Sequence, residues 1–183
     1  QGYLAADGNK LLVTSRTTPA CFDCTTGELL YYPLSDRSYG KHVGGYGASI
    51  WKDWYFNNAT AYRLSDGLAL GPVLADIVGS DTVIGIGATG DIVGFVPTEE
   101  QTVDPKDKKT KTHLSARPAW KLQTEPALDR IHIQAGSRLY GSSRDGLIAA
   151  IEVPEGDEQA RMVWRDKVHG RVWSMLAGDG KLF

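Results

Sequence analysis

Residues 21–31 read CFDCTTGELLY, and this stretch decides the fold. It begins with a short apolar segment around Phe22 and ends with a second one, Leu29-Leu30-Tyr31. Between them Thr26-Gly27 closes a tight turn, because glycine readily adopts the positive φ that such turns need. The stretch therefore predicts two short antiparallel strands joined by a turn at Gly27.

The same pattern returns along the chain at intervals of about 40 residues, the period of a propeller repeat. Its central apolar or aromatic positions are Phe22, Tyr62, Phe95 and Ile151. The last interval is longer because it holds an insertion of about 20 residues, which leaves a unit near the same period. The other half of each unit, a strand followed by a tight turn and a new strand, is seen at 6–12, 46–56, 74–84, 135–140 and 177–183.

Each unit thus predicts four short strands separated by turns, and no segment shows the apolar spacing of a helix. A four-stranded sheet cannot bury both of its faces alone, so neighbouring sheets must stack and cover one another. The sequence therefore predicts an all-β fold, a β-propeller of four-stranded antiparallel blades with about four blades present.

The first unit also resembles a known repeat. Asp23, Thr26 and Gly27 match the quinoprotein-like (PQQ-like) pattern A-x-D-x-x-T-G-x-x-x-W, with Cys21 in place of Ala and Tyr31 in place of Trp. The other units keep fewer of these marks. The second unit keeps Ala61 and Gly67, but it has Arg63 in place of Asp, Asp66 in place of Thr and Gly71 in place of Trp. The fourth keeps Ala150 and Trp164 and has Glu152 in place of Asp. The third clearly keeps only Trp120.

This resemblance implies that the aromatic residue docks between blades, while the Asp and Thr-Gly organise a turn. It also implies that residues 1–183 form a single partial domain, part of a larger wheel of seven or eight blades. Neither Gln1 nor Phe183 resembles a natural terminus, so we expect a longer parent protein. The resemblance alone favours a periplasmic or other extracytoplasmic location.

The same repeat occurs in enzymes and in scaffolds, so the fold does not choose between them. The first hypothesis is a non-enzymatic binding or scaffold module with no catalytic residues and no cofactor. The alternative is a fragment of a quinone (PQQ)-dependent dehydrogenase, which would require PQQ and calcium; the chain has no vicinal Cys-Cys pair and no evident calcium set. A sugar- or peptidoglycan-associated surface protein is a third possibility.

Several smaller motifs have structural explanations. Cys21 and Cys24 form a C-x-x-C pair, which is only half of a four-thiolate zinc site. Residues 85–90 read GIGATG and mimic a phosphate loop, but a strand follows where a helix is required. The histidines, at 42, 113, 132 and 169, show no metal-binding spacing, and the tryptophans, at 51, 54, 120, 164 and 173, are expected to pack between blades.

Residues 98–118 are expected to form an inserted polar loop that either docks a partner or is solvated. The insertion has no aromatic residue on which nucleotide bases could stack, and the net charge of the chain is -2, so nucleic acid is not an expected partner. No apolar run is long enough to span a membrane. We expect a protein partner or other domains of the parent chain, and self-association through exposed blade edges.

Overall fold

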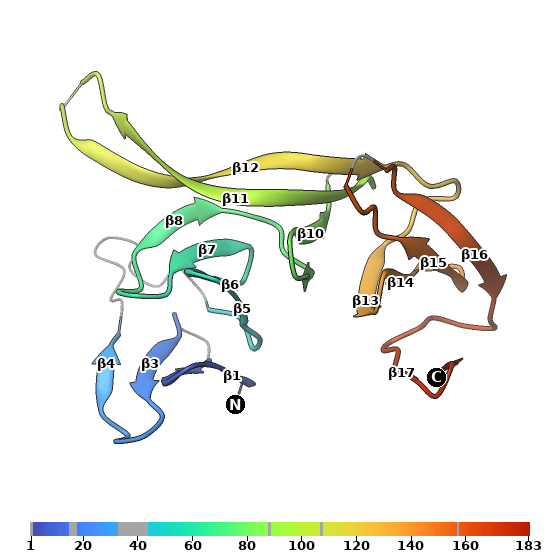
Figure 1. Ribbon diagram of the computed structural model, residues 1–183, viewed down its shortest axis with the longest axis horizontal. Coiled ribbons are helices and arrows are strands. Elements are labelled where there is room, and N and C mark those ends of the chain that lie inside the picture. The colour runs from blue at the N-terminus through green and yellow to red at the C-terminus, as the bar shows by residue number, and fades with distance from the viewer. Residues whose placement is uncertain (1, 15–17, 33–43, 88, 107, 157) are drawn as a thin grey trace. The chain divides into compact units, whose positions relative to one another are not determined.

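The computed structural model describes residues 2–14, 18–32, 44–87, 89–106, 108–156 and 158–183. Regular structure in these residues is entirely β-strand, arranged as four four-stranded sheets and one two-stranded hairpin (Figure 1). Strands that follow one another in sequence are neighbours in each sheet. The predicted all-β class with four-stranded antiparallel sheets is confirmed. No helix in this described part is long and apolar enough to cross a membrane.

The strand limits follow the predicted units. The first sheet contains β1 (Leu4–Asp7), β2 (Lys10–Val13), β3 (Ala20–Asp23) and β4 (Leu29–Tyr31). The second contains β5 (Ser49–Trp51), β6 (Trp54–Asn57), β7 (Thr60–Arg63) and β8 (Ala69–Pro72). The third contains β9 (Ile77–Val78), β10 (Val83–Ile86), β11 (Ile92–Val103) and β12 (Thr110–Leu122). The fourth contains β13 (Arg130–Ala135), β14 (Arg138–Ser142), β15 (Leu147–Glu152) and β16 (Arg161–Lys167), and the hairpin contains β17 (Ala177–Gly178) and β18 (Lys181–Leu182).

The sequence period is also a structural period. The four central positions each lie on the third strand of a sheet: Phe22 in β3, Tyr62 in β7, Phe95 in β11 and Ile151 in β15. In three sheets the pairing of the third and fourth strands shifts register directly before this position. Such irregularities bend a strand and increase its twist, so their recurrence identifies equivalent positions in different sheets.

The chain divides into two compact units. The first comprises Gln1–Val73 and Thr98–Ser115, and the second comprises Leu74–Pro97 and Ala116–Phe183. The assignment of residues 1–183 to one propeller domain stays a prediction. Each unit has its own hydrophobic core between two stacked sheets.

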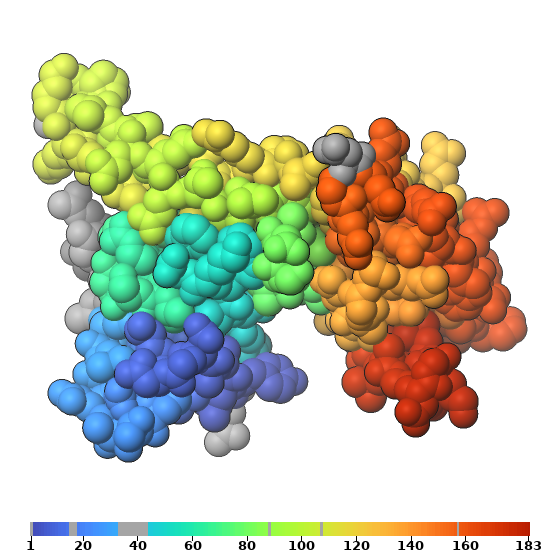
Figure 2. Space-filling model, viewed as in Figure 1, coloured from blue at the N-terminus to red at the C-terminus, as the bar shows by residue number. Residues whose placement is uncertain are grey.

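In the first unit the core lies between the sheets β1–β4 and β5–β8. Leu12 and Cys21 of the first sheet contact the tyrosine pair Tyr55 and Tyr62 of the second, whose rings stack with centroids 4.9 Å apart. Leu12, Cys21 and Tyr55 have no exposed surface. Figure 2 shows the first sheet (blue) packed closely against the second (cyan to green). Removing such side chains from water is the main source of stability for stacked sheets.

In the second unit the core lies between β9–β12 and β13–β16. Ile84 and Ile92 of the first of these sheets pack with Leu139 and Ile151 of the second, and all four are completely buried. Each of the four-stranded sheets therefore hides at least one face against a neighbour, as the alternation of apolar residues predicts.

The segment 98–118 is not a loop, which corrects the sequence-based expectation. Most of it lies in β11 and β12, which run side by side as a long ribbon past the other strands of their sheet (Figure 1). A two-stranded ribbon satisfies the backbone hydrogen bonds of its inner edges with its own arms, so it can carry polar side chains on both faces. The polar composition was therefore compatible with strands that lack a fully buried face.

Candidate functional site

A small residue beside an aromatic one is the common element of the sheets. Cys21 of β3 is paired with Tyr31 of β4, and Ala150 of β15 is paired with Trp164 of β16. In the third sheet a methyl group added to Gly94 would lie only 2.2 Å from the ring of Trp120, so the indole rests directly on that glycine. These are the Ala and Trp positions of the sequence repeat, brought together across neighbouring strands.

The second sheet departs from this arrangement. Its small residue is Ala61 of β7, which is paired with Gly71 of β8. The aromatic member is therefore absent from this position, as the sequence indicated.

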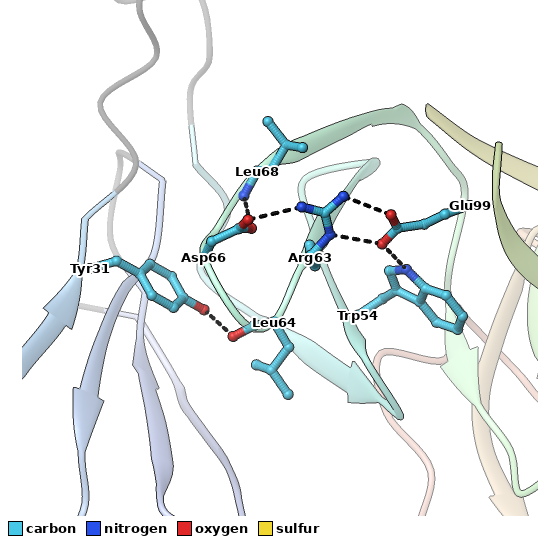
Figure 3. A network of polar contacts seen from close by, with 7 residues as sticks. All are labelled: Tyr31, Trp54, Arg63, Leu64, Asp66, Leu68 and Glu99. Atoms are coloured by element: carbon cyan, nitrogen blue, oxygen red, sulfur yellow. Dashed lines mark hydrogen bonds and ion pairs between the residues drawn. The ribbon is translucent and has the colours of Figure 1, made fainter. Parts of the chain in front are cut away.

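Tyr31 docks the first sheet on the second. Its hydroxyl donates a hydrogen bond of 2.8 Å to the carbonyl oxygen of Leu64, in the turn after β7 (Figure 3). Burial, followed by the neighbouring Cys21 thiol, raises the pKa of Tyr31 above its ordinary value. The hydroxyl thus remains a donor over the whole physiological range, which is the docking role expected for the aromatic residue of the repeat.

The turn after β3 is organised by Asp23. Its Oδ1 accepts the backbone N–H groups of Thr25 and Thr26 at 2.7 and 2.9 Å, and its Oδ2 accepts Asn9 Nδ2 at 2.9 Å. The hydrogen bonds from Thr26 and Thr25 lower the pKa of Asp23. Gly27 has a φ of 74°, which explains why glycine is needed there.

The equivalent turn after β7 has Arg63 in place of the aspartate. Its backbone geometry is retained: Gly67 has a φ of 75° and donates to the Arg63 carbonyl at 2.9 Å, as Gly27 donates to that of Asp23 at 2.8 Å. Asp66 now caps the turn by accepting the Leu68 N–H at 2.9 Å. The backbone turn therefore survives the exchange of aspartate for arginine.

The Arg63 side chain makes a polar cluster with the base of the β11–β12 ribbon (Figure 3). Nε and Nη2 donate to the two oxygens of Glu99 at 3.0 and 2.7 Å, while Nη1 donates to Asp66 at 2.9 Å. Trp54 Nε1 also donates to Glu99, at 3.1 Å. The Arg63 guanidinium holds the pKa of Glu99 below its ordinary value. The cluster therefore fixes the ribbon to the second sheet.

A cavity of about 430 Å³ adjoins this cluster. Its lining residues are Lys10, Asp53, Trp54, Arg63, Leu64, Ser65 and Glu99. The guanidinium of Arg63 and the carboxylate of Glu99 already bind each other in a bidentate pair, an arrangement that gives strong geometric specificity. We assign the cluster an anchoring role in the protein rather than a catalytic one.

The tryptophans are distributed differently from the sequence-based expectation. Trp51 and Trp54 lie in one sheet and stack on each other, with centroids 5.8 Å apart and planes 20° apart. Trp173 lies outside the strands and is 72% exposed. Packing at the interface of two sheets is observed for Trp120, which contacts the core of the second unit.

The remaining candidate residues do not converge on one site. Cys21 is buried and Cys24 is exposed, and both are free thiols. His132 Nε2 lies 2.7 Å from Ser142 Oγ, and burial lowers the pKa of this imidazole. His42 falls outside the described residues. Within the described ranges, no group of three or more His, Cys, Asp or Glu side chains is placed to hold a metal ion.

The other two histidines and the glycine-rich segment are also separate. His113 lies in β12 with Nε2 3.9 Å from Glu100, and His169 is exposed after β16. In the glycine-rich segment Gly85 lies in β10, which ends at Ile86 and pairs with β11 from Ile92, and Gly87 and Gly90 lie in the hairpin connection, with the Gly90 N–H donating to the Gly87 carbonyl at 2.9 Å.

Sequence reasoning missed Glu99, which it treated only as part of a charge-balanced insertion. The one signal was that Arg63 reverses the charge of the aspartate in the repeat, but Asp66 three residues later already offers it an acidic partner. The distance between Arg63 and Glu99 in the chain hid this second partner.

Comparison with known proteins agrees with the fold. No protein-family model and no curated protein matches the sequence. The solved structures it resembles include the computationally designed Ika8 protein, at a TM-score of 0.57 and 13% identity, and BamB from Moraxella catarrhalis, at 0.52 and 13%. In each case 98% of this chain is covered but only 53% of the other, so the chain spans about half the length of these propellers.

Proposed function

We propose that the chain is a run of PQQ-like repeats that acts as a non-enzymatic module for binding another protein. The observation that carries the proposal is the Tyr31–Leu64 dock, made by the residue at the Trp position of the repeat. The pairing of Cys21 with Tyr31 and of Ala150 with Trp164 further supports the alignment to this repeat.

An exposed apolar patch in the second unit is a surface on which another protein, or further parts of the parent chain, can pack. We define it as Trp173, Leu176 and Phe183, which are 72%, 70% and 71% exposed. Leu176 and Phe183 lie side by side, since their backbones exchange hydrogen bonds of 2.9 and 2.8 Å. The Arg171 guanidinium lies over the Trp173 ring at 5.2 Å. Exposed aromatic residues next to arginine are typical of the energetic centres of protein interfaces.

The proposal is tested by selecting peptides from a random library on the immobilised chain and repeating the measurement with the double variant Trp173→Ala/Leu176→Ala. We expect selected peptides to lose at least about tenfold in affinity for the variant, as for loss of an interface hot spot. The variant Leu74→Ala removes another exposed leucine, outside the patch, and should bind normally. Failure to recover any saturable binder would contradict the proposal, and equal binding to all variants would contradict the role of this patch.

The dehydrogenase alternative is tested separately by adding PQQ and calcium. The proposal expects no change in melting temperature and no reduction of an electron-accepting dye with alcohols or sugars. A saturable thermal shift together with dye reduction would replace the scaffold proposal by the enzymatic one.

A further inference from the structure

The second unit contains a cavity at the place where the first unit makes its aromatic dock. Leu64, which receives Tyr31, directly follows β7 and donates its N–H to Asp53 at 2.8 Å. Val153 directly follows β15 and donates its N–H to Ser137 at 2.8 Å, so it is the equivalent residue of the fourth sheet. Both Val153 and Trp120 line a cavity of about 400 Å³.

The cavity is built from the facing parts of two sheets. Its lining residues are Gly79, Ser80, Asp81, Thr82, Val96, Ala119, Trp120, Gln134, Val153, Pro154, Glu155, Gly156 and Glu158. The volume is within the range of small-ligand pockets, although near its lower end. It is large enough for one amino-acid side chain with its adjoining amide groups.

Two buried polar atoms in this lining have no hydrogen-bond partner. They are the donor Trp120 Nε1 and the acceptor Gln134 Oε1. The amide of Gln134 is oriented by Nε2, which donates to the Gly136 carbonyl at 3.2 Å. Each unpaired buried group costs about 1–3 kcal/mol, and native proteins contain few of them. Together they match a ligand that offers one acceptor and one donor.

The charge of the lining indicates that the ligand also carries a positively charged group. Asp81, Glu155 and Glu158 contribute carboxylates, whereas the described lining residues include no Lys, Arg or His. Within the described part of the chain none of these three carboxylates takes part in an ion pair. A concave site with one sign of charge attracts the opposite charge, and an indole ring adds a favourable surface for a cation.

We infer that this cavity binds a basic amino-acid residue, a guanidinium or ammonium group carried next to an amide. The amide carbonyl accepts from Trp120 Nε1, the amide N–H donates to Gln134, and the cation lies near the acidic rim. The inference names a partner chemistry for the binding module proposed above, at a site separate from the patch of Trp173, Leu176 and Phe183. Both polar atoms are covered in this structure, with the indole resting on Gly94, so binding requires the two side chains to turn toward the cavity.

The test titrates N-acetyl-L-argininamide into the ¹⁵N-labelled chain and follows the indole N–H signals, with Trp120 identified by the variant Trp120→Phe. We expect a saturable shift of the Trp120 signal with a dissociation constant of about 1 mM, corresponding to about 4 kcal/mol. N-acetyl-L-citrullinamide has the same shape without the charge and should bind at least about tenfold more weakly. No saturable shift, or equal affinity for the two compounds, would overturn the inference.

Variants then test which carboxylates attract the cation of the ligand. Glu155→Gln/Glu158→Gln should weaken argininamide about tenfold and leave citrullinamide unchanged, because both side chains are exposed and their replacement preserves the fold. Glu28→Gln removes an exposed carboxylate from the first unit and should change neither affinity. If Glu28→Gln weakened argininamide binding as much as Glu155→Gln/Glu158→Gln does, the effect would come from the overall charge of the chain, and the proposed site would be overturned.

A final comparison distinguishes a basic residue within a peptide from a free small cation as the ligand. Acetyl-Gly-Arg-Gly-amide should bind at least as tightly as N-acetyl-L-argininamide if the cavity accepts a residue within a peptide. Binding of argininamide without the peptide would overturn the peptide part and identify a site for a free small cation. These outcomes are independent of the library selection, which reports on the patch around Trp173.

Discussion

Tyr31 in the first unit and Trp120 in the second occupy the same place in their sheets, yet they meet different surroundings. Tyr31 donates to the Leu64 carbonyl, whereas the indole N–H of Trp120 is buried without a partner. The receiving turns differ, since the one after β7 spans 64–68 and the one after β15 spans 153–160 and contains Pro154. Both turns line a cavity, but the shorter one accepts a hydrogen bond from its aromatic residue, whereas the indole N–H beside the longer one has no partner. The two units thus use equivalent positions differently.

The largest expected effect concerns the contact under Trp120. In Gly94→Ala the new methyl group would lie 2.2 Å from the indole, so the ring or the strand must move. We expect the free energy of unfolding of the second unit to fall by about 3 kcal/mol, measured by urea denaturation. The matched variant Gly178→Ala places a methyl group with no atom within 4 Å and should be close to neutral. A neutral Gly94→Ala would show that Trp120 does not rest on this glycine.

A smaller effect concerns the anchor of the ribbon in the first unit. Because Arg63 lowers the folded-state pKa of Glu99, the pair stabilises the fold above the unfolded-state pKa of about 4.3 and loses this contribution as pH falls through the lower folded-state value. The pair is partly exposed, so we expect Glu99→Gln to cost about 0.5–1 kcal/mol at pH 7.

The pH dependence supplies the control for this anchor. The difference in the free energy of unfolding between wild type and Glu99→Gln should stay constant above about pH 4.3 and shrink as the pH falls from there through the lowered folded-state pKa of Glu99. Glu28→Gln, at an exposed turn position, should show no such convergence. A difference that stays constant with pH would mean that the Glu99 side chain acts through packing and not through its charge.

The sequence predicted what is local and repeated. The third strands around Phe22, Tyr62 and Ile151 were identified because apolar segments and glycine turns recur at a fixed period. Glycine at 27 follows from the φ that the turn requires. These features depend on a few consecutive residues, so the sequence contains them directly.

Features that depend on distant partners were not predicted. Trp51 and Trp54 were expected on separate blades, but they lie on adjacent strands of one sheet, and Trp54 donates to the distant Glu99 of β11. The pairing of Arg63 with Glu99 requires the ribbon of β11 and β12, which was expected to be a loop. Gln134 carried no sequence signal at all, because an unpaired buried oxygen exists only after two sheets have stacked.

The most direct test of the account removes one polar group from each dock and compares the free energies of unfolding. Tyr31→Phe deletes the hydroxyl that binds Leu64, and replacement of Trp120 by benzothienylalanine deletes the indole N–H while keeping the ring shape. The account predicts a loss of about 1–2 kcal/mol for Tyr31→Phe and no loss, or a small gain, for the change at Trp120. Equal losses at both positions, or a loss at Trp120 alone, would contradict the claim that equivalent aromatic residues are bonded in one unit and unbonded in the other.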